Sequence, residues 1–272
     1  IHQEEQGTMV LLLTYQRAGS SFAGELLTSG GGDDILYIFE PLYIWRMKLG
    51  PGADTTLEEN SAKVLGDLLD CKPEVIRHWR RSAFAYFRRR PDHRDFCQVS
   101  KVRVIKSIRA HASFVLPWIK KRPDIKVIHM VRDPRGILNS VQRGGRWWSE
   151  NNRNINLQCN LVEQDLELEQ LGPGRYLRVH YEDLVDKPLE ETKRMFKFAE
   201  MDLGEETVNY LKIHTGLGTE HLRKPGYFNT YRDSNFRHDH WKTKLDNREI
   251  EFVENACSSI MRKLGYTPLP EK

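Results

Sequence analysis

Five short apolar runs recur along the chain, each bounded by polar residues, glycine or proline. They are rich in valine, isoleucine and leucine, as strands buried on both faces of a parallel sheet are. The predicted strands are Val10–Thr14, Ile35–Phe39, Val102–Ser107, Val127–Val131 and Tyr176–Val179. In the segments outside these runs, apolar residues recur at the spacing of an α-helix. The predicted helices are Ser21–Leu27, Pro73–Arg88, Arg135–Val141, Leu161–Leu171, Leu189–Ala199 and Asn247–Leu264.

This alternation predicts an α/β layer fold with a central parallel sheet, in which ligands bind at the carboxyl ends of the strands. We expect one domain over residues 1–272, with flexible ends at 1–9 and 269–272. Residues 143–156 and 215–240 show no periodicity and are candidate covers over a site. The net charge of +4 favours anionic ligands only weakly.

One polar loop, between the first predicted strand and the first predicted helix, has the composition of an anion-binding turn. Residues 11–27 read LLLTYQRAGSSFAGELL. Gly19 permits close backbone approach, the helix N-terminus presents N–H groups, and Arg17 adds a guanidinium. Ser20 and Ser21 add hydroxyl groups. The G-x-x-x-x-G-K-[ST] pattern of a P-loop is absent, and a serine-capped turn with a surface arginine remains the alternative.

A second strand-to-helix junction lies in VIHMVRDPRGILNSV, residues 127–141. Pro134 suits the first turn of a helix, and Asp133 is its predicted cap. Arg132 at the strand end and Ser140 within the helix are together placed to bind a second phosphate group. The alternative is an ordinary helix start with a solvated Arg132.

These two motifs together resemble the sulfotransferases that use 3′-phosphoadenosine 5′-phosphosulfate (PAPS). Within that family the chain is similar to the Golgi carbohydrate sulfotransferases that act on the 6-hydroxyl of galactose, N-acetylglucosamine or N-acetylgalactosamine. Further matching motifs are FEPLY (39–43), VIKSIR (104–109), HYEDL (180–184) and RKLGY (262–266). The resemblance runs from about Val10 to Pro268. It implies a P-loop-like three-layer α/β sandwich around a central parallel sheet.

The resemblance also implies that PAPS is the sulfuryl donor, leaving as adenosine 3′,5′-bisphosphate (PAP). The matching 5′-phosphosulfate loop consists of Arg17, Ala18, Gly19, Ser20, Ser21 and Phe22. Arg132 and Ser140 match the 3′-phosphate motif. Ala18 stands where this branch usually has Ser or Thr, so one hydroxyl contact is lost. Arg232 and Ser234 are expected to close over the nucleotide, from a segment that differs from the Gly-rich one of cytosolic relatives.

Sulfuryl transfer to an alcohol is an in-line displacement in which negative charge develops on the bridging oxygen. Arg17 and Lys106 are the candidate donors to that oxygen. In cytosolic relatives a histidine follows the matching lysine and acts as the base, but Ile108 holds that position here. We therefore assign the base to Glu40, where the resemblance also places the carboxylate that activates the acceptor. Pro41 is expected to hold Glu40 in extended geometry.

Other interpretations of the acid–base residues stay open. Glu40 is alternatively a strand-end carboxylate paired with a neighbouring arginine, and His111 is then the second candidate for the base. Arg109 is expected to orient a phosphate group or the acceptor, and both Arg109 and His111 are candidate substrate-binding residues. No metal is expected, because arginine and lysine donors neutralise the charge that develops on a sulfuryl group.

Two segments are candidates for binding the acceptor, which we expect to be a glycan or glycosaminoglycan rather than nucleic acid. Residues 77–94 carry seven arginines, either as one wall of a polyanion groove or as a solvated helix face. Arg146, Trp147 and Trp148 are expected to contact sugar rings, unless the tryptophans anchor their loop in the core. The acceptor sugar, its ring position and the oligomeric state stay open. The competing functions are a P-loop kinase and a non-catalytic polyanion-binding module.

Four cysteines, with no C-x-x-C pair, are compatible with reduced thiols or with two disulfides. The resemblance implies the Golgi lumen, as a type II membrane protein whose anchor lies outside the given residues. An oxidising lumen permits disulfides. On that basis we predict the pairs Cys71–Cys97 and Cys159–Cys257.

Overall fold

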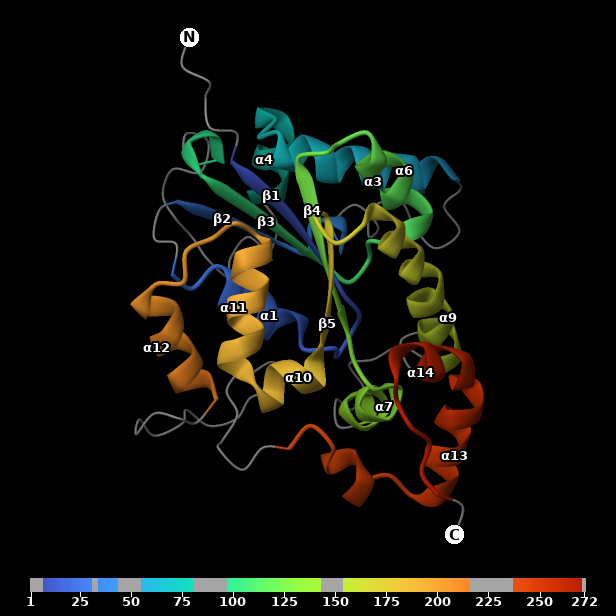
Figure 1. Ribbon diagram of the computed structural model, residues 1–272. Helices are drawn as coiled ribbons and strands as arrows, with labels where there is room; N and C mark the ends of the chain where they lie inside the picture. The colour runs from blue at the N-terminus through green and yellow to red at the C-terminus, as the bar shows by residue number, and fades with distance from the viewer. Residues whose placement is uncertain are drawn as a thin grey trace.

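The computed structural model describes residues 7–30, 34–43, 55–80, 97–142, 154–215 and 237–270. Within these ranges, one five-stranded sheet has the order β2-β3-β1-β4-β5, and every neighbouring pair is parallel (Figure 1). The strands are β1 (Thr8–Leu13), β2 (Ile35–Phe39), β3 (Val102–Ser107), β4 (Ile125–Val131) and β5 (Tyr176–His180). All five predicted strands are therefore confirmed.

Two strands begin two residues earlier than their apolar runs predict. In β1, Thr8 and Met9 pair with Val102 and Arg103 of β3, so the ladder extends beyond the run that starts at Val10. β4 begins at Ile125 for the same kind of reason, since Ile125 pairs with Met9. Pairing with a neighbouring strand, rather than local composition, sets these ends.

The helices largely occupy the segments between the strands. Their bounds are α1 (Ser20–Leu27), α3 (Thr55–Leu69), α4 (Pro73–Arg80), α6 (Ala112–Lys120), α7 (Pro134–Gln142), α9 (Ile155–Asp165), α10 (Tyr181–Asp186), α11 (Pro188–Phe198), α12 (Glu205–His214), α13 (Asn247–Ala256) and α14 (Ser258–Leu264). The described residues also include the 3₁₀ turns η3 (Leu166–Leu171) and η4 (His240–Thr243). The predicted helix 247–264 is interrupted at Cys257, and the predicted helix 161–171 consists of the end of α9 followed by η3.

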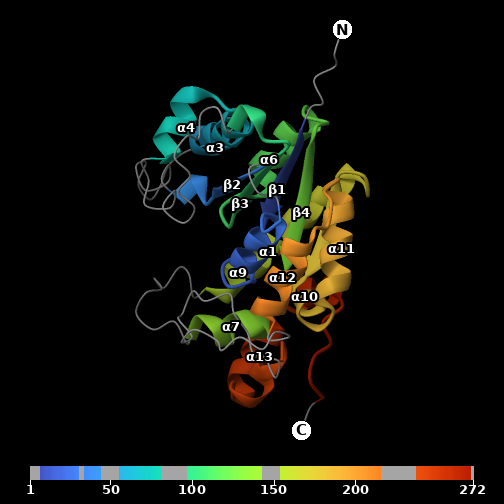
Figure 2. The ribbon, with the colours of Figure 1, turned by 90° about the vertical axis from the view of Figure 1, so that its left-hand side faces the viewer.

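Helices cover both faces of the sheet and make three layers, as predicted. Met9, Leu11 and Leu13 of β1 point to the apolar cluster that contains α3, α4, α6, α9 and α14. The alternate residues Val10 and Leu12 point to the cluster that contains α1, α10, α11 and α12. Seen after a turn of 90°, α3 and α4 lie on one side of the strands and α11 on the other (Figure 2). This two-sided burial explains why the strands are continuous apolar runs.

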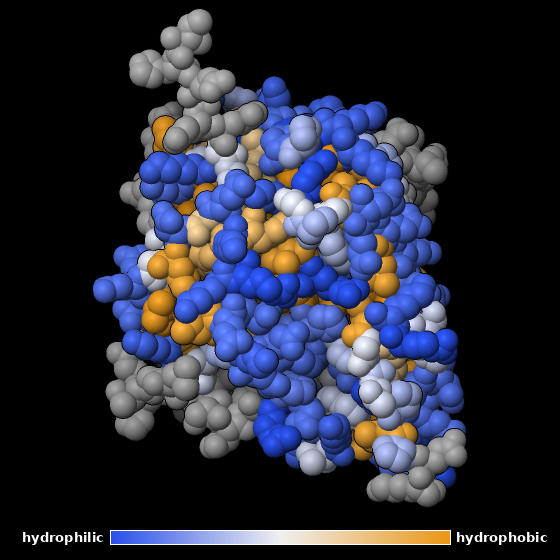
Figure 3. Space-filling view, in the orientation of Figure 1, coloured by the Kyte–Doolittle hydropathy of each residue, from blue (hydrophilic) through white to orange (hydrophobic). Residues whose placement is uncertain are grey.

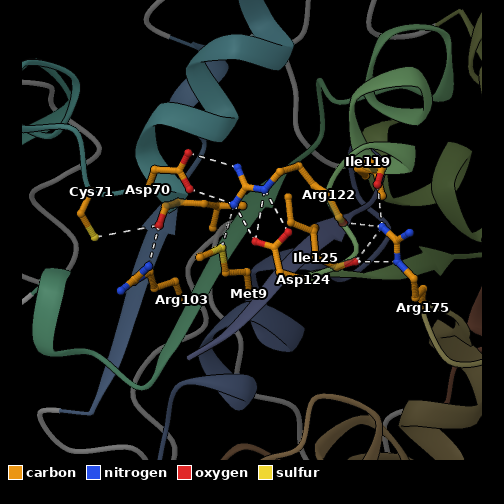
Figure 4. A network of polar contacts seen from close by, with 10 residues as sticks. Met9, Asp70, Cys71, Arg103, Ile119, Arg122, Asp124, Ile125 and Arg175 are labelled. Atoms are coloured by element: carbon orange, nitrogen blue, oxygen red, sulfur yellow. Dashed lines mark hydrogen bonds and ion pairs between the residues drawn. The ribbon is translucent and has the colours of Figure 1, made fainter. Parts of the chain in front are cut away.

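The amino ends of the strands are held together by arginine networks (Figure 4). Arg122, just after α6, pairs with Asp70 at 2.8 Å and with Asp124 at 2.6 Å. Its hydrogen bond to the carboxylate lowers the pKa of Asp124. Arg175 donates to the carbonyl oxygens of Ile119 and Arg122, both at 2.6 Å. This end of the sheet is thus occupied by structural contacts, and the opposite, carboxyl end carries the candidate site.

The outer face formed by α11 and α12 is mostly hydrophilic, with apolar patches between the polar side chains (Figure 3). Three apolar residues on these helices and on α13 stand partly in solvent, namely Leu189, Ile213 and Phe252. Across the part of the chain that the structure describes, no helix combines the length and the apolar composition needed to cross a bilayer.

Both predicted disulfides are confirmed. Cys71–Cys97 joins the end of α3 to the segment before β3, and Cys159–Cys257 joins α9 to the junction of α13 and α14. All four residues are buried. The second bridge closes a longer loop, since its sequence separation is 98 residues against 26 for the first.

We expect the two bridges to differ in their contribution to stability. The chain-entropy relation gives about 5 kcal/mol for the Cys159–Cys257 loop and about 3–4 kcal/mol for the Cys71–Cys97 loop. Replacing both cysteines of a pair by alanine should therefore lower the free energy of unfolding more for the Cys159–Cys257 pair, by about 1 kcal/mol. Urea denaturation of the two double variants measures this difference. A larger loss from the Cys71–Cys97 pair would contradict it.

Candidate active site

The loop after β1 turns the chain sharply into α1. Arg17 has a φ of 63° and Gly19 a φ of 90°, both in the left-handed region. A Cβ atom on Gly19 would lie 2.5 Å from Cδ2 of Tyr181, so this position requires glycine for space as well as for conformation. Gly19 itself is the N-cap of α1, and no side chain among the described residues caps this helix. The first N–H groups of α1 are therefore left for an anion, and the serine-capped turn is not what forms.

The junction after β4 forms as predicted at its helix start. Asp133 accepts a hydrogen bond from the backbone N–H of Arg135 at 2.9 Å, so its role as a cap is confirmed. Arg135 makes structural contacts within the protein. Its guanidinium pairs with Asp133 and Glu254 and donates to the carbonyl of Thr267, which ties α7 to the end of the chain.

The structure brings the two predicted phosphate motifs into direct contact. Nε of Arg17 donates to Oγ of Ser140 at 2.9 Å, and Nη1 of Arg132 donates to the carbonyl oxygen of Arg17 at 2.7 Å. Figure 1 shows α7 beyond the carboxyl ends of the strands, on the side away from the N-terminus. Two loops that are more than a hundred residues apart in the sequence thus form one polar surface.

Arg132 is buried rather than solvated, with 7% of its surface exposed. Its guanidinium lies 4.1 Å from the centroid of the Tyr181 ring, and its Nε has no hydrogen-bond partner among the described residues. Gly136 leaves the space for it, since a Cβ there would lie 3.1 Å from that Nε. Buried polar atoms are nearly always paired in native proteins, so the unpaired Nε indicates a place for a ligand oxygen.

Glu40 lies at the carboxyl end of β2 in a buried group of charges. Its Oε1 accepts from Nζ of Lys106 at 2.8 Å and from the N–H of Ile108 at 2.9 Å. Its Oε2 accepts from Nη1 of Arg109 at 2.7 Å. Glu40 and Lys106 are each 3% exposed. Burial lowers the pKa of Lys106, and the Glu40 carboxylate opposes that shift.

Of two expectations about Glu40, the one about its backbone is wrong and the one about an ion pair is confirmed. Its φ is 47°, so the prediction that Pro41 holds it in extended geometry is wrong. The reason is that the chain turns at once into a short helical segment at Pro41–Tyr43. The ion pair with an arginine, left open by the sequence, is present. Left-handed backbone is uncommon outside glycine and is often found at functional sites, and Arg17 and Glu40 both adopt it.

His111 belongs to a different polar group. Its Nδ1 lies 3.0 Å from Oδ2 of Asp165, and Asp165 also accepts from the hydroxyl of Tyr15 at 2.8 Å. That hydroxyl lies 2.7 Å from Nε2 of His129. The sequence singled out neither Tyr15, His129 nor Asp165, because each sits within an ordinary apolar or acidic pattern and no local signal marks it.

The buried His129 makes a pH-dependent contribution to stability. Burial lowers its pKa from 6.5 to about 4. Between these values the unfolded chain binds a proton that the folded chain does not, so stability falls as the pH is lowered from 6.5 to 4. The shift corresponds to about 3 kcal/mol. Urea denaturation across this range should show a shallower pH dependence for His129→Gln than for the parent chain, and equal slopes would contradict the assignment.

The HYEDL motif packs against both predicted phosphate loops. Tyr181 packs against Gly19 and Arg132, as described. Glu182 accepts from the N–H of Asp133 at 3.0 Å and from the hydroxyl of Tyr266 at 2.9 Å. Burial raises the pKa of Glu182. The first turn of α10 therefore holds the loop after β4 in place.

Several predicted residues lie outside the described ranges, namely Arg146, Trp147, Trp148, Arg232 and Ser234. The arginine-rich segment 77–94 is described only as far as Arg80. Within the described part of the chain, no group of three or more His, Cys, Asp or Glu residues is arranged to hold a metal ion.

Comparisons with known proteins find that the chain is similar to sulfotransferases. The model of the sulfotransferase family matches residues 77–205. Carbohydrate sulfotransferase 1 of Danio rerio is 26% identical, over 97% of this chain and 79% of that protein. Carbohydrate sulfotransferase 3 of Homo sapiens is 25% identical, over 94% and 67% respectively. The solved structure of retinol dehydratase with retinol and PAP superimposes with a TM-score of 0.55 at 15% identity, over 98% of this chain and 84% of that one, which shows a shared fold.

Proposed function

We propose that this chain, a member of the sulfotransferase family, transfers a sulfuryl group from PAPS to a hydroxyl group of a sugar. The acceptor we propose is a glycan or glycosaminoglycan, with the 6-hydroxyl as the position modified. The names of the relatives support a carbohydrate acceptor. The observation that carries the proposal is the contact between the two phosphate motifs through Arg17, Ser140 and Arg132.

The residues present fit a nucleotide with two separate phosphate groups. The α1 N-terminus and the Gly19 turn offer N–H groups to a 5′-phosphosulfate, and the unpaired Nε of the buried Arg132 suits a 3′-phosphate oxygen. The proposed contacts are those of Arg17, Ala18, Gly19, Ser20, Ser21 and Phe22 at one end and of Arg132 and Ser140 at the other. Arg232 and Ser234 are proposed to cover the nucleotide.

When bound, PAPS supplies the activated sulfuryl group. Arg17 and Lys106 are proposed to donate hydrogen bonds to the leaving oxygen as negative charge develops there. One such preorganised donor typically lowers the barrier by about 2.7–4 kcal/mol. Lys106 keeps its ammonium group in a buried position because the Glu40 carboxylate lies 2.8 Å away.

Glu40 is proposed to accept the proton of the sugar hydroxyl at Oε2. Its other oxygen, Oε1, is held by two donors, Lys106 and the N–H of Ile108. Oε2 is held by Arg109, whose side chain is 26% exposed and so is the partner that an incoming hydroxyl can reach. On this proposal Arg109 exchanges part of its contact with Glu40 for the acceptor. Arg146, Trp147 and Trp148 are proposed to bind the neighbouring sugars.

The two disulfides support an oxidising compartment, and we propose the Golgi lumen, with a membrane anchor outside the given residues.

The decisive experiment is transfer of labelled sulfate from PAPS to a panel of desulfated glycans and glycosaminoglycans, in the presence of a chelator. We expect a labelled product, and linkage analysis of that product tests the 6-hydroxyl. Calorimetry with PAP, expected to show one site, separates an enzyme from a simple polyanion-binding module. Metal-dependent ATP turnover without sulfate transfer would overturn the proposal in favour of a kinase.

A further inference from the structure

Asp165, at the end of α9, forms hydrogen bonds with two loops of the candidate site. Its side chain is 1% exposed. Oδ1 accepts from the N–H of Ala112, the first residue of α6, at 2.6 Å. Oδ2 accepts from the hydroxyl of Tyr15 at 2.8 Å and lies 3.0 Å from Nδ1 of His111. Tyr15 is two residues before Arg17, and His111 is two residues after Arg109, so Asp165 joins the loop after β1 to the loop after β3.

The direction of each hydrogen bond follows from the chemistry of the groups. Tyr15 has one hydroxyl proton and gives it to Asp165, so its oxygen accepts from Nε2–H of His129. Nδ1 of His129 then accepts from the hydroxyl of Tyr176 at 2.8 Å. Every donor in this buried chain thus points toward Asp165, which is the arrangement that an ionised, accept-only carboxylate stabilises.

The same argument identifies the ring nitrogen of His111 that carries the proton. An ionised Asp165 cannot donate, so Nδ1 of His111 carries the hydrogen that lies between them. In the neutral imidazole the lone pair is then on Nε2, for which the described residues provide no partner. The side chain of His111 is 13% exposed. Since Nδ1 faces the buried carboxylate, the opposite edge of the ring is the one open to a ligand.

We propose that Asp165 is a positioning residue that fixes the Nδ1–H tautomer of His111, so that Nε2 accepts a hydrogen bond from a hydroxyl of the acceptor sugar. This inference rests on the proposed function, because it names what holds the acceptor at that site. Glu40 keeps its own role, since the hydroxyl bound by His111 is one that does not react.

Asp165→Asn separates this role from simple packing. The asparagine oxygen can still accept from the N–H of Ala112, but its amide group now takes the place of Oδ2 and donates toward both His111 and the hydroxyl of Tyr15. Nδ1 of His111 must then accept, and the proton moves to Nε2, where the sugar hydroxyl loses its acceptor. We expect the KM for the sugar to rise roughly tenfold, with the KM for PAPS changed by less than about twofold.

A double-mutant cycle tests whether Asp165 acts through His111. In the His111→Ala background, Asp165→Asn should cause no further loss in kcat/KM for the sugar. Tyr176→Phe is the matched control, because it removes a hydroxyl at the far end of the same chain and should leave the sugar KM unchanged. An equal loss from Asp165→Asn in both backgrounds would show a purely structural role and overturn the proposal.

The tautomer itself is measurable by nitrogen NMR of the histidine-labelled parent chain, without any turnover. An Nε2–H signal for neutral His111 would overturn the inference, whereas absence of sulfate transfer by the parent chain would instead refute the proposed function. If Asp165→Asn does not fold, two substitutions of His111 decide the question. His111→Gln, which carries an acceptor near the Nε2 position, should retain more sugar affinity than His111→Asn, and equal losses would refute the proposal.

Discussion

Glu40→Gln is expected to lower kcat for sulfuryl transfer by about 10²–10⁴-fold, the usual contribution of a general base. The amide oxygen can still accept from Lys106 and from the N–H of Ile108, which hold Oε1 in the parent chain. The phosphate motifs do not include Glu40, so the affinity for PAP should stay within a few-fold. Steady-state kinetics together with PAP calorimetry measures both effects. Removing the charge also leaves the buried Lys106 without its counter-ion, so a loss of thermal stability is expected as well.

Glu200→Gln is the matched control for this variant. Glu200 also has a left-handed backbone, with a φ of 55°, and also pairs with a lysine, Lys126, at 2.8 Å. Its side chain is 68% exposed, and Lys126 lies at the amino end of the sheet, away from the site. This control should keep full activity. Full activity of Glu40→Gln would remove Glu40 from the role of base and leave the ion pair as its whole function.

Gly19→Ala is expected to weaken PAP binding by at least about tenfold. The left-handed backbone costs a non-glycine residue roughly 1–2 kcal/mol, and the new Cβ would lie 2.5 Å from the Tyr181 ring. Relief of that contact requires the loop or the ring to move. The same ring carries the guanidinium of Arg132, so both phosphate motifs are disturbed at once. Calorimetric titration with PAP measures the loss.

The control is Gly204→Ala, at a glycine whose φ is not positive and which has nothing within 4 Å of the new Cβ. It should leave PAP affinity and stability nearly unchanged. Adding Tyr181→Leu to Gly19→Ala should not restore binding, because it relieves the contact but removes the ring from Arg132. Parent-like PAP affinity in Gly19→Ala would show that the turn does not form the nucleotide site.

The strands were predictable because burial on both faces leaves a signal in every residue of the run. Among the helices of the described residues, four were not predicted: α3, α6, α10 and α12. The apolar pattern of α6 includes Pro117, which ordinarily argues against a helix interior. α10 and α12 carry many charged or polar residues and bury few side chains, whereas α3 buries a larger apolar set, namely Ala62, Val64, Leu65, Leu68 and Leu69. Local patterns therefore underestimate helices such as α10 and α12, whose buried face is narrow.

The residues of the candidate site also differ in whether a local sequence pattern could single them out. Its two phosphate motifs are local, because a strand end, a turn and a helix start must be contiguous in the sequence, and so Arg17, Gly19 and Arg132 could be singled out directly. Glu40 could be identified only with the help of a resemblance, and its local geometry was predicted wrongly. Asp165 left no signal at all, since an aspartate in an acidic helix is indistinguishable from a surface residue until its partners are known.

By itself, the sequence determined the order of the strands along the chain, the place of two strand-to-helix turns with the composition of anion-binding loops, and the supply of cysteines for two bridges. These are properties of short contiguous segments, where backbone preference and hydrophobic periodicity act over a few residues. Only the tertiary structure decided which loops meet. The strand order β2-β3-β1-β4-β5 brings Arg17 to Ser140, Glu40 to Arg109 and Tyr15 to Asp165. Such contacts depend on how the sheet is wound, which no local pattern records.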